Sequence, residues 1–259
     1  MHALYRFFPK TKEELIEIIK AEVERKGWNC SLNHIDVSKI TDMSYIFAGA
    51  NIYSDYESYD LEEFNGDISR WDVSNVENMK GMFQLSNYTG NNGDLSNWNV
   101  SKVENMRAMF AESQYIGELA KWNVSNVTNM NSMFYNTMFI GDISKWKPIK
   151  VKDMGGMFWG FGNENSKFNA KNFDISKWDV SSVTDMNAMF AHSSFNSDIS
   201  NWNVRGVLDM RQMFMYSDFY QDISSWKVNI ECETYDIFDN CPLDKGDFPE
   251  EYKPKGIIE

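Results

Sequence analysis

A thirteen-residue segment, WDVSNVENMKGMF from Trp71, recurs along most of the chain and limits what the chain can fold into. The spacings between successive tryptophans that begin a copy are 27, 24, 24, 32, 24 and 24 residues. An earlier copy, IDVSKITDMSYIF, begins at Ile35, and a degraded last copy, WKVNIECETYDIF, begins at Trp226. The complete copies between them begin at Trp71, Trp98, Trp122, Trp146, Trp178 and Trp202. Eight copies with a basic period of 24 residues predict a repeat protein whose successive turns stack on one another.

The second half of each copy has the apolar spacing of a short helix. In the copy at Trp71, four apolar residues fall at i, i+3, i+6 and i+7 and form one stripe, namely Val76, Met79, Met82 and Phe83. Ser74 and Glu77 form a capping-box pattern, which predicts that this helix begins at the serine. We expect the stripe to lie in the core of every turn.

The residues ahead of each tryptophan have the pattern of a short strand. The segment 68–73 is rich in β-branched residues and bounded by glycine and aspartate. Ile68 and Trp71 are three residues apart, so strict alternation cannot place both inside, and we infer a bend between them or a tryptophan lying over the flank of the stack. The tryptophan column is then either a buried hydrophobic spine or an exposed stack that holds a glycan or a peptide. We favour the buried spine.

The signature W-[DN]-V-S-x-V-x-[ND]-M-x-x-M-F, followed by F-N-x-D-I-S, resembles the bacterial surface-protein repeat family, the BspA-like leucine-rich repeats. The resemblance covers about residues 30 to 240. Together with the periodicity it predicts an α/β solenoid, a leucine-rich-repeat-like right-handed stack with parallel strands on one side and short helices on the other. The resemblance also implies a binding or adhesive role in bacteria, and the family has no catalytic residues to carry over.

The segments outside the repeats are expected to cap the stack. Thr11 and Glu14 form a capping box, and Gly27 is a natural helix stop, so we expect an amphipathic helix between them. Its expected apolar face is Leu15, Ile18, Ile19 and Val23. We therefore divide the chain into an N-terminal capping segment (1–33), a repeat region (34–240) and a C-terminal cap and tail (241–259).

Composition excludes some partners and places the protein in a compartment. The net charge of −13 and a pI near 4.7 argue against binding to nucleic acid. The polar face of the expected N-terminal helix is mixed in sign, which favours a cap of the stack over a membrane-bound helix. We identify neither a secretory leader nor a membrane-spanning segment. Cys30, Cys232 and Cys241 have no ligand spacing and suggest a reducing environment. We expect a cytoplasmic protein, with secretion or surface display by an unrecognised route as the alternative.

No group of residues has the pattern of a catalytic, cofactor or metal site. The three histidines, His2, His34 and His192, lie in different parts of the chain. A column of aspartates precedes the tryptophans and could in principle bind Ca²⁺, namely Asp67, Asp94, Asp142, Asp174, Asp198 and Asp222. Their repetition favours turn chemistry instead, in which each aspartate accepts local backbone hydrogen bonds. We expect neither an enzyme nor a cofactor.

Insertions into the repeat provide the candidate binding residues. The largest covers residues 48–63 and a second begins at Trp159, both after the phenylalanine that ends the thirteen-residue segment. Insertions confined to one edge of a repeat array often form its binding surface. The predicted partner-binding residues are Tyr53, Asp55, Tyr56, Glu57, Tyr59, Trp159 and Phe161. We expect a non-enzymatic protein–protein interaction module for a partner with a basic surface. The alternatives are a surface adhesin and, more distantly, an acidic inhibitor that mimics nucleic acid.

Overall fold

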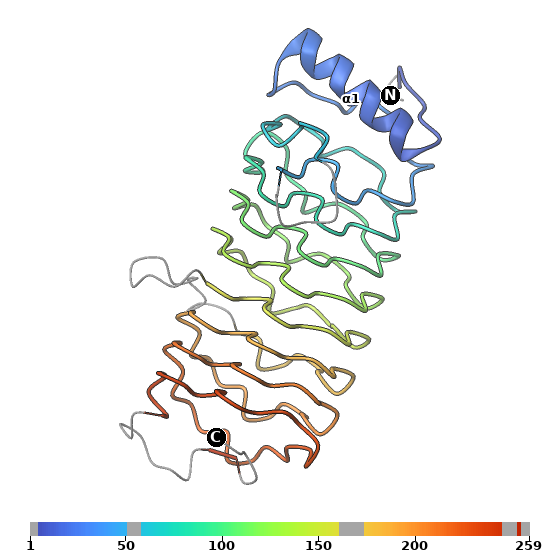
Figure 1. Ribbon diagram of the computed structural model, residues 1–259. Coiled ribbons are helices and arrows are strands. Elements are labelled where there is room, and N and C mark those ends of the chain that lie inside the picture. The colour runs from blue at the N-terminus through green and yellow to red at the C-terminus, as the bar shows by residue number, and fades with distance from the viewer. Residues whose placement is uncertain (1–4, 51–57, 161–173, 245–252, 255–259) are drawn as a thin grey trace.

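The protein is an elongated stack of repeated chain turns closed at one end by a single helix. The computed structural model describes residues 5–50, 58–160, 174–244 and 253–254. The colours of Figure 1 run in order along the stack, with helix α1 at the N-terminal end and the last repeat at the other. We number the repeats 1 to 8 by their first residues and count positions within a repeat from that residue as position 0. The first residues are Ile35, Trp71, Trp98, Trp122, Trp146, Trp178, Trp202 and Trp226.

Adjacent repeats are joined by a backbone ladder along positions 7 to 14. The amides at positions 8, 10, 12 and 14 donate to the carbonyls at positions 7, 9, 11 and 13 of the next repeat. Between repeats 3 and 4 these bonds are Met106 to Asn129 (2.9 Å), Ala108 to Asn131 (2.8 Å), Phe110 to Met133 (3.0 Å) and Glu112 to Tyr135 (2.8 Å). Position 7 forms an isolated parallel bridge between each pair of repeats, from Asp42 to Glu233. We call the outward side of this segment the ladder face.

The predicted strands and helices of the repeats are wrong. The described residues contain one α-helix, α1, and the pairing between repeats consists of isolated bridges without a sheet. The ladder contains left-handed residues at positions 10 and 14, as at Ala108 (φ 52°) and Glu112 (φ 55°) in repeat 3. Such a residue fits neither an α-helix nor a regular strand. The α/β solenoid is therefore replaced by a stack of tight turns.

Tight turns also explain the apolar spacing that resembled a helix. The amide of Met82 donates to the carbonyl of Met79 (3.2 Å), and that of Val76 donates to Val73 (2.9 Å). A tight turn brings its first and fourth residues close together, so residues three apart both face the core. The expected bend ahead of the tryptophan is confirmed, because Trp71 donates to Ile68 (3.1 Å).

The capping box expected within the repeats is absent as well. The amide of Ser74 donates to the carboxylate of Asp72 (3.1 Å), so the serine lies inside a turn that the preceding aspartate closes. The amide of Glu77, the expected partner in the box, donates to the carbonyl of Thr41 in the preceding repeat. Short polar side chains favour such local bonds over helix formation.

The predicted core is confirmed, and the tryptophan column is buried. The stripe of repeat 2 is 0% exposed, and the tryptophans that begin repeats are 2–4% exposed. Each of these indoles also donates to the carbonyl three residues ahead of the first residue of the preceding repeat, as Trp98 does to Ile68 (3.2 Å). Neighbouring rings stack, with 6.5 Å between the centroids of Trp71 and Trp98. The column is therefore a hydrophobic spine that also satisfies its polar N–H groups.

Helix α1 (Lys12–Lys26) confirms the expected N-terminal helix. The hydroxyl of Thr11 accepts from the amide of Glu14 (3.2 Å), and Gly27 ends the helix at φ 86°. Its buried apolar residues are Leu15, Ile16, Ile19 and Val23, while Ile18 is only partly buried. The helix lies across the first repeat in Figure 1 and covers its core. No helix in the described part of the chain is long and apolar enough to cross a membrane.

Candidate binding surfaces

An open groove lies between the second half of α1 and the end of the insertion in repeat 1. It has a volume of about 550 Å³ and is lined by Lys20, Val23, Glu24, Gly27, Trp28, Tyr59, Asp60 and Leu61. The indole of Trp28 is 41% exposed. We call this feature the end groove.

Tyr59 is the predicted binding residue that the end groove contains. The ammonium of Lys12 lies 5.7 Å from the centre of its ring, and the tyrosine packs partly buried against the core. Lys12 is itself held by the hydroxyl of Ser44 at 2.8 Å. A cation over an aromatic face stabilises this placement of the ring. Tyr59 is thus a fixed element of the groove wall.

The ends of the first insertion are structural. Leu61 is 1% exposed, and the hydroxyl of Ser58 donates to the carbonyl of Ala48 (3.0 Å). The amide of Gly49 belongs to the ladder and donates to Gln84 (2.8 Å). These flanking residues therefore belong to the stack.

Of the other predicted residues, Trp159 lies in the described part of the chain, and it does not join Tyr59. Tyr53, Asp55, Tyr56, Glu57 and Phe161 lie outside the described residues. Trp159 is half-buried on the ladder face of repeat 5, four repeats away. Its ring and that of Tyr135 pack edge to face, with 5.4 Å between the ring centroids. The carbonyl of Trp159 accepts from the amide of Asn136 (2.8 Å), so its backbone is part of the ladder.

A buried carboxylate, which sequence reasoning missed, fixes α1 to the start of repeat 1. The side chain of Glu22 is 4% exposed and pairs with Arg25 at 2.9 Å, with His34 at 2.8 Å and with Lys26. Burial favours the neutral acid, but the hydrogen bonds from Lys26 and Arg25 outweigh it and lower the pKa of Glu22 to about 2. Glu22 is therefore an ionised anchor of the capping helix.

The aspartate column is confirmed as turn chemistry. Each aspartate accepts from the amide of the residue two positions later, as Asp142 does from Ser144 (2.8 Å). Hydrogen bonds from Ser144 also lower the pKa of Asp142. The same bond recurs at Asp67, Asp94, Asp174, Asp198 and Asp222. Across the described ranges, no group of three or more His, Cys, Asp or Glu side chains could hold a metal ion.

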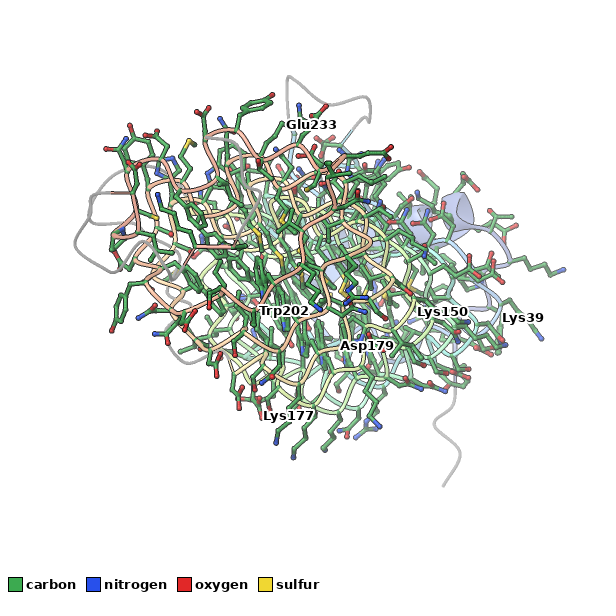
Figure 2. The ribbon with its side chains drawn as sticks, turned by 90° about the horizontal axis from the view of Figure 1, so that it is seen from below. Lys39, Lys150, Lys177, Asp179, Trp202 and Glu233 are labelled. Atoms are coloured by element: carbon green, nitrogen blue, oxygen red, sulfur yellow. The ribbon has the colours of Figure 1, made fainter. Side chains whose placement is uncertain are left out.

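A lysine-rich surface on repeat 5 is a second feature that sequence reasoning missed. The segment KWKPIKVK, residues 145–152, contains four exposed lysines. Figure 2 shows Trp202 inside the stack, with Lys177 projecting from one side and Glu233 from the opposite side. Lys39 and Lys150 occupy the same position in repeats 1 and 5 and project from a shared flank. The signal was four lysines within eight residues.

The fold and the recurring sequence define a repeat protein built from stacked tight turns. The model of one protein family matches residues 21–114, 85–172 and 137–248, which together span most of the chain. The chain belongs to this family, described as "Mycoplasma protein of unknown function, DUF285". The assignment to the BspA-like leucine-rich repeats was therefore wrong, because a different family matches and the repeats lack the expected helices and sheet. Comparisons with curated proteins and with solved structures each found no match.

Proposed function

We propose that this protein is a non-enzymatic interaction module that binds a protein partner at the end groove and the adjoining insertion. The observation that carries the proposal is that Trp28, with an exposed indole, and Tyr59 line the same groove. Tryptophan and tyrosine are enriched among the residues that contribute most to protein interfaces. An exposed indole next to a fixed aromatic wall provides such an anchor point.

Charge around the groove favours a partner with a basic surface. Asp60, Glu62 and Glu63 follow Tyr59 directly, and the insertion before it adds Asp55 and Glu57 in the sequence. The chain as a whole carries −13 charges. Acidic side chains at the rim of an interface increase the association rate of a basic partner more than they increase the final affinity.

The experiment compares two changes at the groove with a matched change elsewhere. The first is Trp28→Ala, and the second replaces residues 51–57 by a Gly-Ser linker while Ser58 and Leu61 remain. The control is Tyr220→Ala, because Tyr220 is also 41% exposed but lies in repeat 7. Each tagged protein is used to capture partners from cells of the native host, and a partner enriched by the wild type is then titrated by calorimetry.

Trp28→Ala should lower the affinity for the captured partner at least tenfold, a loss typical of an interface anchor. The linker variant should lose binding while its thermal midpoint stays close to that of the wild type. Tyr220→Ala should bind normally. If both groove variants bind the partner with full affinity, the end groove is not the binding site and the proposal fails.

A further inference from the structure

Repeat 5 carries a surface charge opposite in sign to that of the whole protein. Four lysines within eight residues, the first of which is the last residue of repeat 4, all lie on exposed positions, whereas the chain has a net charge of −13. They are Lys145, Lys147, Lys150 and Lys152. Ile149, between Lys147 and Lys150 in the sequence, is 44% exposed and adds an apolar side chain. We call these five side chains the lysine surface.

The repeats on either side leave the lysine surface largely uncompensated. In repeat 4 the residues at the positions of Lys147, Lys150 and Lys152 are uncharged, namely Asn123, Asn126 and Thr128. In repeat 6 the corresponding residues are Asp179, Ser182 and Thr184. Lys150 donates to the side-chain oxygen of Asn126 at 2.7 Å, which holds its ammonium group at the surface.

Neighbouring carboxylates are engaged by other donors. Asp142, whose charge interacts with that of Lys145, accepts from the amide of Ser144 (2.8 Å). Asp179 accepts from the amide and the hydroxyl of Ser181 at 3.0 and 2.6 Å. Asp153 accepts from Gly155 (2.9 Å) and Asn131 (3.1 Å) on the ladder face. None of the four lysines forms an ion pair with a carboxylate in the described part of the chain.

We propose that the lysine surface is a second docking site, which binds an acidic protein segment with an apolar side chain placed over Ile149. This site goes beyond the end groove in position and in charge, since it selects a partner of opposite sign. Four ammonium groups along one turn of the chain match an extended segment rich in aspartate and glutamate.

The short range of screened electrostatic interactions favours a short acidic segment as the partner, over a membrane or a nucleic acid. At physiological salt, exposed charges act over about 8 Å, so a peptide lying along one repeat senses mainly the lysines. A bilayer or a long duplex would also meet the aspartate column that runs along the stack, for example Asp94, Asp174 and Asp198. Their repulsion adds to that of the net negative charge.

The test measures fluorescence anisotropy of a labelled oligoglutamate peptide with a central leucine. The triple variant Lys147→Gln, Lys150→Gln, Lys152→Gln is compared with the control Lys39→Gln, Lys102→Gln, Lys227→Gln. Both sets remove three charges from exposed positions, and Lys102 donates to Asn75 at 2.7 Å as Lys150 does to Asn126. Thermal midpoints of both variants verify that the stack is intact.

The wild type should bind the peptide, and binding should weaken as salt is raised. The repeat-5 variant should bind about tenfold more weakly, and the control should change less than twofold. Trp28→Ala should leave peptide binding unchanged, which separates this site from the end groove. Equal losses in both triple variants would overturn the proposal, because net charge alone would then be responsible. Tighter binding of phosphatidylserine vesicles or duplex DNA through the same lysines would also overturn it.

Discussion

Replacing Tyr115 by phenylalanine should stabilise the protein, although the tyrosine is fully buried in the core. Its ring is 0% exposed and packs between Tyr88 and Phe139, with centroids 6.2 Å away on each side. Its hydroxyl oxygen is buried without a hydrogen-bond partner among the described residues. A buried polar group in this state costs about 1–3 kcal/mol, and removing the oxygen recovers that cost while the ring stays in place. We expect a gain of about 1 kcal/mol.

Tyr88 provides a matched control of opposite sign. It occupies the same position in repeat 2, but its hydroxyl donates to the carbonyl of Gly93 (2.7 Å). Repeat 2 is 27 residues long, and the three additional residues bring this carbonyl within reach. Tyr88→Phe removes the bond and leaves a buried carbonyl without its donor, so it should cost about 1 kcal/mol. The two substitutions delete the same atom from stacked rings.

Urea unfolding, followed by tryptophan fluorescence, measures both effects as shifts in the free energy of unfolding. Thermal midpoints should move by about 2–4 °C per kcal/mol in a chain of this size, upward for Tyr115→Phe and downward for Tyr88→Phe. If Tyr115→Phe destabilises the protein by more than about 0.5 kcal/mol, its hydroxyl has a partner and the reasoning is refuted. Equal shifts in both variants would lead to the same conclusion.

Three further substitutions test the turn geometry, the core and the cap. Ala108→Gly should stabilise the protein by up to about 1 kcal/mol, because residue 108 has a left-handed φ of 52°. In a helix interior the same substitution would destabilise the protein by about 1 kcal/mol. The sign of the change in urea unfolding therefore distinguishes a turn from a helix. Phe134→Ala should cost about 3–5 kcal/mol, and a measured loss below about 1 would show that the ring is not in the core. The pKa of Glu22 lies below its ordinary value of 4.5, so its contribution of about 3 kcal/mol is complete above that pH and is lost as pH falls toward 2. Glu22→Gln should flatten this acid dependence in unfolding curves recorded between these pH values, and an unchanged dependence would contradict the assignment.

The stacking and the core of this protein were predictable from the sequence, because both follow from repetition. An apolar residue that returns at one position in every repeat must face a shared interior, and Met79 and Phe83 do so. The capping helix was predictable for a different reason, since Thr11 and Gly27 are local signals that act without tertiary context.

The local structure of the repeats was not predicted, because a spacing of three residues suits both a helix and a tight turn. Gly81 and Gly156 fall inside the expected helices of repeats 2 and 5, where glycine is unfavourable. Both glycines have left-handed φ values, 59° and 58°. Given more weight than the apolar stripe, these residues would have favoured turns.

The candidate sites were less predictable than the core. Averaging over repeats identifies shared positions but hides what distinguishes one repeat, and the net charge of −13 hides a local cluster of lysines. The end groove is lined by both Trp28 and Tyr59, residues 31 positions apart in the chain. No periodic pattern links them.

Repeat 5 shows how one repeat can change its surface without changing its core. Trp146 is 2% exposed and Phe158 is 0% exposed, as in the other repeats. Pro148 replaces the valine at position 2, yet its carbonyl still accepts from the amide of Val151 (3.2 Å). The tight turn uses only the carbonyl of this residue, so proline is accommodated although it has no N–H. Its neighbours Lys147 and Ile149 both point outward. Because each repeat packs only on its two neighbours, such a change of surface costs the rest of the stack little stability.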